Sequence, residues 1–139
     1  FRFRPRILVD VQTVNTAASV LGRTISLPLG IAPSGVQKLA NPIGEIGTAQ
    51  AAQEAGTVMI LSSHSTVSLE DVRAGAPDCI LWQQLFIFDD SSLTESLVKR
   101  ASAHGYAAIV LIVDSPVPGD DTGRHQSLTH LPGGLRFKL

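Results

Sequence analysis

Four short, mostly apolar segments recur along the chain, and stretches that favour helices separate them. Each segment is bounded by proline, glycine, serine or acidic residues, and this pattern predicts strands that are buried on both faces. The first of them is expected to end at Ala32, and the last is the most continuously apolar. The predicted strands are Pro28–Pro33, Thr57–Leu61, Leu81–Ile87 and Ala107–Val113.

The stretches between the strands carry start and stop signals for helices. Asn41 is the predicted N-cap of the first helix, with a proline at the first helical position and Gly56 as the C-terminal stop. Acidic residues follow Ser68 and favour a second helix start through the helix dipole. The helices are predicted over Pro42–Ala55, from Ser68 onward, and from Ser91 or Ser92 to about His104.

Alternating strands and helices of this kind predict a parallel sheet made of right-handed βαβ units. An open doubly wound sheet and a closed eight-stranded barrel both use such units, and periodicity leaves both open. The first strand is followed by Ala32–Gln37, which lacks the G-x-G-x-x-G pattern of dinucleotide-binding open sheets. Because a whole barrel takes about 250 residues, a chain of 139 residues supplies four of its units.

The flanking segments are less regular. Arg6–Val11 and Thr24–Ser26 are expected to form a small hairpin or cover, and residues 115–139 are expected to form a loop. The chain starts at Phe1 without an initiator methionine and ends at Phe137–Leu139 with no clear targeting signal. We therefore interpret it as a fragment or a trimmed product.

Composition bounds the class of protein. With 44% apolar residues, the chain can bury one core, and its net charge of −1, with acids and bases mixed, favours no nucleic-acid partner. No apolar run approaches the roughly 20 residues of a spanning helix, so no membrane span is expected. The single cysteine, Cys79, precedes an apolar run and is expected to be a buried thiol.

Eight short segments, taken in order, resemble the FMN-dependent 2-hydroxy-acid oxidases and dehydrogenases, the glycolate oxidase family. Each is weakly specific, but their order and spacing follow the family. The resemblance implies an α/β fold, the N-terminal half of a (β/α)8 TIM barrel with four parallel strands, as a single partial domain with FMN at the strand ends. The segments are Phe3–Arg6, Leu21–Gly22, Pro28–Pro33, Gln37–Ala40, Pro42–Glu45, Leu61–Ser63, Gln84–Leu85 and Val113–Pro116.

The resemblance also implies which residues face the cofactor. It places the backbone of Ala32, Pro33 and Ser34 against the flavin ring, the hydroxyl of Ser62 in contact with it, and the amide of Gln84 at its polar edge. A flat ring with polar atoms on its rim needs such fixed donors and acceptors. The alternative for Ser62 and Gln84 is a strand-end cap or an ordinary buried polar group.

Catalysis in this family uses a histidine base that an aspartate orients. Asp114 matches the aspartate by resemblance, and its alternative role is a loop cap. The base histidine and one substrate arginine belong to the family's C-terminal half, and none of the four histidines of this chain matches the base. We therefore expect the chain to be inactive alone.

Four positions depart from the family pattern. His64 replaces a tryptophan, Phe86 a tyrosine, Ile112 a threonine and Asp121 an arginine, and His64, Phe86 and Asp121 belong to the expected substrate pocket. A carboxylate at Asp121 repels a carboxylate substrate, and Arg124 replaces the arginine only if the loop is rearranged.

These departures indicate an altered pocket for a 2-hydroxy acid or a related substrate. The alternatives are a catalytically silent relative that binds flavin, or a structural fragment. Because a half barrel exposes unpaired strand edges, we expect the missing C-terminal half or a homo-oligomer as partner. The family suggests a peroxisomal or a cytoplasmic location.

Overall fold

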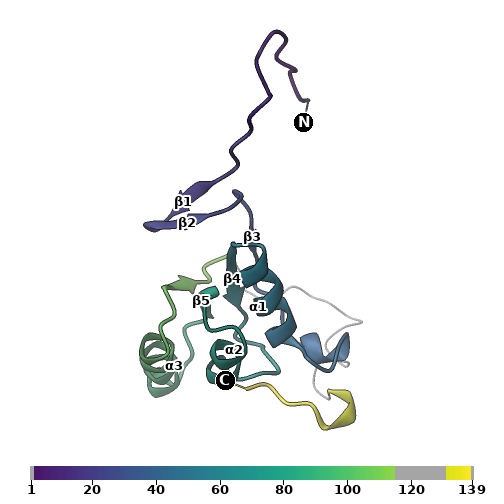
Figure 1. Ribbon diagram of the computed structural model, residues 1–139. Helices are drawn as coiled ribbons and strands as arrows, with labels where there is room; N and C mark the ends of the chain where they lie inside the picture. The colour runs from purple at the N-terminus through teal and green to yellow at the C-terminus, as the bar shows by residue number, and fades with distance from the viewer. Residues whose placement is uncertain (1, 115–130, 139) are drawn as a thin grey trace.

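The computed structural model describes residues 2–114 and 131–138. Two antiparallel strands, β1 and β2, form a hairpin, and four further strands form a separate sheet below it in Figure 1. The strands are β1 (Ala18–Val20), β2 (Arg23–Ile25), β3 (Gly30–Ile31), β4 (Val58–Leu61), β5 (Ile80–Leu85) and β6 (Ala108–Leu111). The helices are α1 (Glu45–Glu54), α2 (Leu69–Gly75) and α3 (Ser91–Ala103), with short 3-10 turns at Gln37–Leu39 and Pro132–Gly134.

The larger sheet is parallel throughout, and its strands follow chain order, β3-β4-β5-β6. A helix follows β3, β4 and β5 in turn, so each crossover returns to the next strand along. Right-handed crossovers in one direction place all their helices on one face of the sheet, as in a barrel, whereas a doubly wound sheet reverses its order. The strand order therefore favours the barrel over the open sheet.

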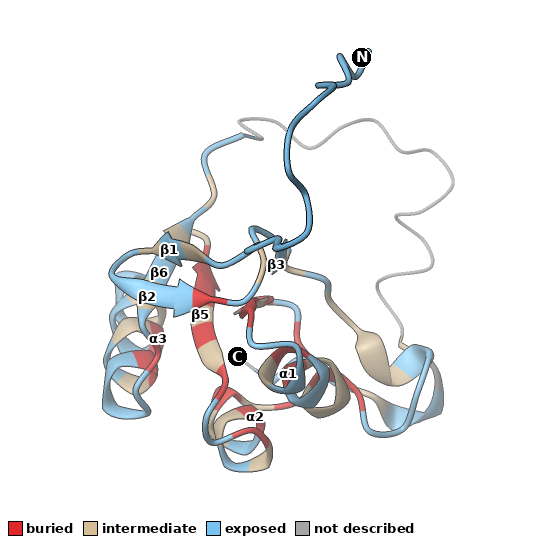
Figure 2. Cartoon of the chain, turned by 45° about the horizontal axis from the view of Figure 1, so that its top comes forward, coloured by how far each residue is buried: buried red, intermediate tan, exposed pale blue. Residues whose placement is uncertain are grey.

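The core lies between this sheet and the three helices. Met59, Leu61 and Leu81 project from the strands against the helices, where they meet Ala49 and Val72. Figure 2 shows the buried residues on the strands and on the helix faces turned toward them. Small alanines on α1 let that helix approach the sheet closely, which explains their spacing in the sequence.

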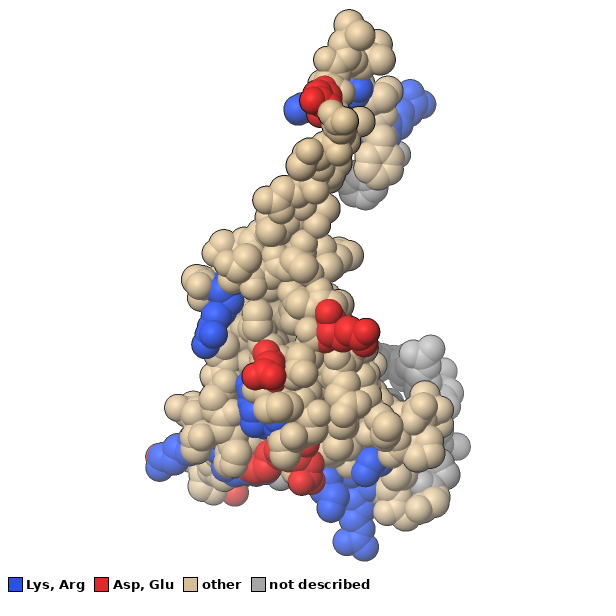
Figure 3. All heavy atoms as spheres, in the orientation of Figure 1, with Lys and Arg blue, Asp and Glu red and all other residues tan. Residues whose placement is uncertain are grey.

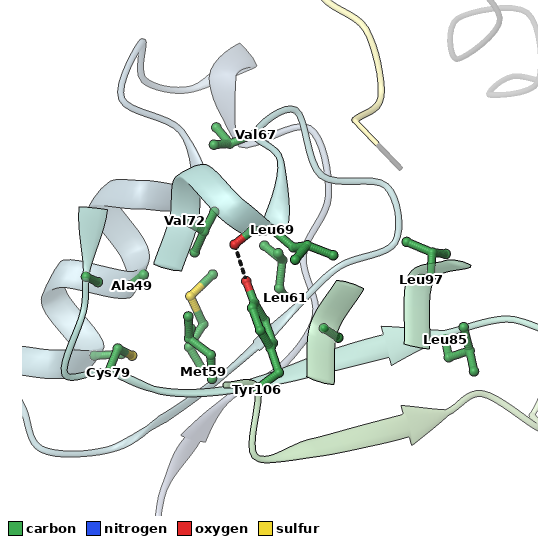
Figure 4. Packing of buried hydrophobic residues seen from close by; sticks show 14 residues of the cluster. Ala49, Met59, Leu61, Val67, Leu69, Val72, Cys79, Leu85, Leu97 and Tyr106 are labelled. Carbon is green, nitrogen blue, oxygen red and sulfur yellow. Dashed lines mark hydrogen bonds between the residues drawn. The ribbon is translucent and has the colours of Figure 1, made fainter. Parts of the chain in front are cut away.

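Tyr106 packs in the same core and is hydrogen-bonded to the start of a helix. Its hydroxyl donates a hydrogen bond of 2.9 Å to the main-chain oxygen of Leu69, at the start of α2 (Figure 4). Desolvation raises the pKa of the Tyr106 phenol, and burial likewise raises the pKa of the Cys79 thiol. Cys79 is buried, as its sequence context predicted.

Helices α2 and α3 are joined by an ion pair. Arg100 Nε and Nη2 donate to the two carboxylate oxygens of Glu70 at 2.7 and 2.9 Å. This two-bond geometry lowers the pKa of Glu70 to about 2 and raises that of Arg100. On the face drawn in Figure 3, acidic and basic side chains are interspersed over the body of the molecule.

The predicted start of the first helix was wrong by three residues. Asn41 does not cap α1. Instead, its side chain accepts a hydrogen bond from the main-chain nitrogen of Ile43 at 3.0 Å and forms a local turn. Gly44, with φ +60°, takes the N-cap position, and α1 begins at Glu45. The second helix starts where expected, with Ser68 as its N-cap, and the third starts at Ser91 with Asp90 as its N-cap.

The segment before the parallel sheet also differs from the expected hairpin. Thr24 pairs with Ser19 in the β1–β2 hairpin, so Arg6–Val11 has no part in it. Residues 2–17 instead run as an extended arm away from the body (Figure 1). No helix within the described ranges has the length and apolar content needed to cross a bilayer.

Candidate functional site

The C-terminal ends of the four parallel strands lie along one edge of the sheet. Ala32–Ser34 follow β3, Ser62 follows β4, Gln84 lies near the end of β5, and Asp114 comes shortly after β6. Leu61 pairs with Gln83 in the register of β4 and β5, so the next residues, Ser62 and Gln84, are neighbours. The topology thus places the residues predicted to bind the cofactor, and the predicted catalytic Asp114, along the same edge of the sheet.

Ser62 and Gln84 contact each other directly. Ser62 Oγ donates to Gln84 Oε1 at 3.0 Å, and the main-chain nitrogen of Ser63 donates to the same oxygen at 2.9 Å. Ser62 Oγ also accepts from the main-chain nitrogen of His64 at 3.0 Å. Ser62, Ser63 and Gln84 are buried, whereas His64 is exposed. The bonds fix the orientation of the Gln84 amide.

The amide group of Gln84 keeps unused donors. Its Oε1 takes two hydrogen bonds, which fill both lone pairs. Among residues 2–114 and 131–138, nothing accepts a hydrogen bond from Gln84 Nε2. Ser62 Oγ has one acceptor position left after the bond from His64. The pair therefore offers donors and an acceptor side by side, which suits a planar ligand whose rim carries carbonyl groups and an N–H.

The face of β5 that carries Gln84 is opposite to the core. Side chains alternate along a strand, so Gln83 points to the helices while Trp82 and Gln84 point to the other face. A hollow of about 420 Å³ lies on that face near the hairpin, lined in part by Val58, Ile60 and Trp82. Trp82 Nε1 is buried and has no hydrogen-bond partner among the described residues.

Three rings gather beside the strand ends. The His64 ring lies edge-on to Phe86 and to Phe137, with centroid distances of 5.6 and 5.4 Å. Phe137 reaches this place because the main-chain nitrogen of Lys138 donates to the oxygen of Ser65 at 2.9 Å. His64 and Phe86 were predicted to line the pocket. Phe137 was not, because residues 115–139 were expected to form a loop.

The loop after β3 is held against the loop after β4. The main-chain nitrogen of Val36 donates to the oxygen of His64 at 3.0 Å. A Cβ on Gly35 would lie 2.9 Å from both that oxygen and His64 Cβ, so only glycine allows this approach. Ala32 and Ser34 are exposed and Pro33 is half-buried, so this segment remains accessible.

Glu45 is a second residue that the sequence analysis gave no role. It is fully buried and contacts both of these loops through hydrogen bonds to Gln37 and Thr66. Its place in the first turn of a helix suggested only a favourable charge at the helix N-terminus. Nothing in the local pattern distinguishes an inward carboxylate from a solvated one.

The remaining predicted residues lie toward β6 or beyond it. Asp114 is exposed, and the main-chain nitrogen of Ile112 donates to the oxygen of Leu85 at 3.0 Å, which continues the pairing with β5. Asp121 and Arg124 lie outside the described residues. Among the described residues, no group of histidine, cysteine and acidic side chains is arranged to hold a metal ion.

Known proteins are similar to this chain in sequence and in fold. The family model of the FMN-dependent dehydrogenases matches residues 1–139. Glycolate oxidase 3 of Oryza sativa subsp. indica is 47% identical over 136 residues, which cover 98% of this chain and 37% of the relative. L-lactate oxidase of Nostoc sp. is also 47% identical, over 98% of this chain and 38% of its own length. The chain thus spans less than two fifths of these relatives.

Solved structures show that the similarity extends to the fold. A tyrosine-to-phenylalanine mutant of mandelate oxidase with (S)-mandelic acid superposes with a TM-score of 0.88 at 35% identity, covering 97% of this chain and 40% of that one. The same mutant with a C4a-OH-FMN adduct gives a TM-score of 0.87. These neighbours are TIM-barrel flavoenzymes, which confirms the expected α/β half-barrel. By sequence and by fold, the chain belongs to the FMN-dependent dehydrogenase family.

Proposed function

We propose that this chain forms the first four βα units of an FMN-dependent oxidoreductase that oxidises a 2-hydroxy acid. The observation that carries the proposal is the Ser62–Gln84 pair, joined by a 3.0 Å hydrogen bond at the C-terminal end of a parallel sheet. Barrel enzymes place their chemistry at that end of the strands. Membership of the FMN-dependent dehydrogenases supplies the reaction class.

FMN fits the polar groups present at the strand ends. Gln84 Nε2 would donate to a carbonyl or ring-nitrogen acceptor on the rim of the flavin, and Ser62 Oγ would accept from the ring N–H. The backbone of Ala32, Pro33 and Ser34 would lie against the ring. Bound there, FMN supplies the acceptor for the two electrons that leave the substrate.

Asp114 is the proposed orienting carboxylate. It follows β6 and is exposed, so it can meet a histidine supplied by a part of the protein beyond these units. A carboxylate hydrogen-bonded to an imidazole holds the ring in place and stabilises its protonated form. Asp114 itself would neither accept the proton that leaves the substrate nor take part in the electron transfer.

The substrate pocket differs from the family pattern at His64, Phe86 and Asp121. His64 is exposed and edge-on to Phe86, so the mouth of the pocket carries an imidazole beside an apolar ring. Phe86 removes a hydroxyl from that wall. We propose a 2-hydroxy acid whose side chain contacts these rings, in a pocket altered from that of glycolate oxidases.

The barrel needs further strands to close. Strands β3 and β6 each pair on one side only within the described sheet, and such edges pair readily with other strands. Trp82 Nε1 also lacks an acceptor among the described residues, which a strand of the other half would supply. We propose that a C-terminal half or a second copy completes the barrel. A peroxisomal or cytoplasmic location belongs to the same proposal.

A chimera tests the activity. Residues 1–139 would replace the matching part of rice glycolate oxidase 3, and FMN reduction would be followed by loss of visible flavin absorption after anaerobic addition of glycolate, L-lactate or (S)-mandelate. We expect reduction by at least one of these acids, and slower reduction by glycolate than in the rice parent. A chimera that holds FMN but is reduced by none of them would point to a silent relative.

A further inference from the structure

Glu45 is a buried carboxylate that the proposed chemistry does not use. It lies in the first turn of α1 with no exposed surface. Its Oε1 accepts from the main-chain nitrogens of Gln37 at 3.1 Å and Thr66 at 2.9 Å. Thr66 Oγ1 lies 2.8 Å from its Oε2. A buried carboxylate is costly unless hydrogen bonds compensate it, and here the donors come from two separate loops.

The two loops are those that carry the proposed flavin contacts. Gln37 belongs to the loop after β3, which begins with Ala32–Ser34, and Thr66 belongs to the loop after β4, which begins with Ser62. The main-chain nitrogen of Lys38 adds a 3.3 Å bond to Thr66 Oγ1. Three main-chain groups therefore converge on the Glu45–Thr66 pair.

The same place in the molecule holds a strained residue. Val36 has φ +49°, a conformation that a β-branched residue rarely adopts. Such a conformation persists only where surrounding contacts fix it. Here Val36 is fixed on one side by its bond to His64 and on the other by the bond from Gln37 to Glu45. A loop under strain would relax if one of these supports were removed.

We propose that Glu45 is a positioning residue that holds the loop after β3 against the loop after β4, and so sets the distance between the two groups of flavin contacts. The proposal rests on the proposed function for the identity of the ligand. It assigns Glu45 no contact with flavin or substrate. Its effect passes through Gln37 to Ser34, whose main-chain oxygen accepts from Gln37 Nε2 at 3.0 Å. On the other side it passes through Thr66 to the adjacent Ser65, whose main-chain nitrogen donates to the oxygen of Ser62 at 3.2 Å.

Glu45→Gln tests the proposal with little change in volume. The glutamine oxygen can still accept from the main-chain nitrogens of Gln37 and Thr66, while its NH2 faces the Thr66 hydroxyl. The substitution therefore keeps the contacts but replaces a charged acceptor with a neutral one, which holds both loops more weakly. Glu54→Gln is the matched control, because Glu54 ends the same helix and is exposed. Two substitutions of Thr66 distinguish the contribution of its hydroxyl from that of its methyl group. Thr66→Val should behave like Glu45→Gln, whereas Thr66→Ser should preserve the wild-type behaviour.

Amide hydrogen exchange of the 139-residue chain gives the direct readout. We expect exchange at Gln37 and Thr66 to rise about tenfold in Glu45→Gln, because hydrogen bonds to a charged acceptor are stronger than those to a neutral one. The amide of Ala52, within α1, should keep its wild-type rate, as should all three sites in Glu54→Gln. Unchanged exchange at Gln37 and Thr66, or a uniform rise that includes Ala52, would overturn the proposal and leave Glu45 an ordinary helix-start residue.

FMN titration of the same proteins, followed by flavin fluorescence, distinguishes this proposal from the proposed function. If the wild-type chain binds FMN, Glu45→Gln should weaken binding at least about tenfold and Glu54→Gln should not. Equal affinities for wild type and Glu45→Gln would overturn the link to the flavin. If the wild-type chain perturbs no FMN signal, the flavin proposal fails for the chain, and hydrogen exchange alone decides the role of Glu45 in holding the loops.

Discussion

Ser63 holds Gln84 by two hydrogen bonds, one to each end of the residue. The main-chain nitrogen of Ser63 donates to the side-chain Oε1 of Gln84 at 2.9 Å, and Ser63 Oγ donates to the main-chain oxygen of Gln84 at 2.8 Å. Ser63 thus fixes both the main chain and the side-chain amide of Gln84. A ligand would meet a Gln84 amide that is already oriented, which lowers the entropy cost of binding.

Gln83 should be replaceable at a gain in stability. Its side chain points into the core, on the face of β5 opposite to the side chain of Gln84. Its Oε1 is buried without a partner among the described residues. Its Nε2 donates to the main-chain oxygen of Gln84, which keeps the bond from Ser63 if this one is lost. We expect Gln83→Leu to raise the free energy of unfolding by about 1 kcal/mol, measured by urea denaturation. A loss of similar size would show that the Gln83 amide is satisfied in solution.

Gly35 should not tolerate a side chain. An alanine Cβ would lie 2.9 Å from the main-chain oxygen of His64, and backbone on both sides must then move. We expect Gly35→Ala to destabilise the chain by about 1–3 kcal/mol and to speed amide exchange at Val36. Gly47→Ala is the control, because its Cβ would meet no backbone but only the side chain of Ile43, at 2.5 Å from Cγ2. That side chain is 53% exposed and can rotate away, and alanine favours helices. Equal effects of the two substitutions would refute the close approach of the loops.

The Glu70–Arg100 pair predicts a loss of stability in acid. The pKa of Glu70 is about 2 in the folded chain against an ordinary value of 4.5, so its contribution is full above about pH 4.5 and is lost as the pH falls toward 2. Since both side chains are 32% exposed, solvent screening limits the expected contribution to about 1 kcal/mol. Urea denaturation of wild type and Glu70→Gln should differ near neutral pH and converge near pH 2.

Glu95→Gln is the control for that comparison. Glu95 pairs with Lys99 on the surface of α3, where both side chains are mostly exposed, so its removal should change stability by only about 0.3 kcal/mol. If Glu70→Gln behaves like Glu95→Gln at neutral pH, the two-bond pair between α2 and α3 contributes nothing beyond a surface contact.

The sequence was enough to predict the four parallel strands, because their apolar runs are continuous. The expected burial on both faces is found for most of β4 and β5 but not for β3 and β6, which lie at the two edges of the described sheet and are partly exposed. The sequence was also enough to place Ser62 at the end of a strand and Gln84 within the next strand, although β5 ends at Leu85 rather than at Ile87 and so brings Gln84 near its end. The start of α1 was missed because Asn41 forms a turn with Ile43 as readily as it caps a helix. Local signals of this kind are ambiguous where two short-range hydrogen bonds compete.

The contacts of Glu45 and Phe137 could not be predicted for a different reason. Both depend on segments that are distant along the chain and that only the folded backbone brings together, such as the bond from Lys138 to Ser65. An acidic residue at a helix start and a phenylalanine in a glycine-rich segment carry no sign of their partners. Tertiary contacts between loops leave no periodic pattern in the sequence, so residues that act through such contacts cannot be recognised from it.

The most direct test of the flavin site is the visible absorption spectrum of FMN titrated with the chain, in wild type, Gln84→Leu and Gln83→Leu. These two substitutions change adjacent glutamines on opposite faces of one strand, so they share composition and differ only in the face they alter. A flavin site at the strand ends predicts a shift of the flavin bands with wild type and with Gln83→Leu, and binding weakened at least about tenfold with Gln84→Leu. No shift with wild type, or the same affinity for Gln84→Leu, would contradict it.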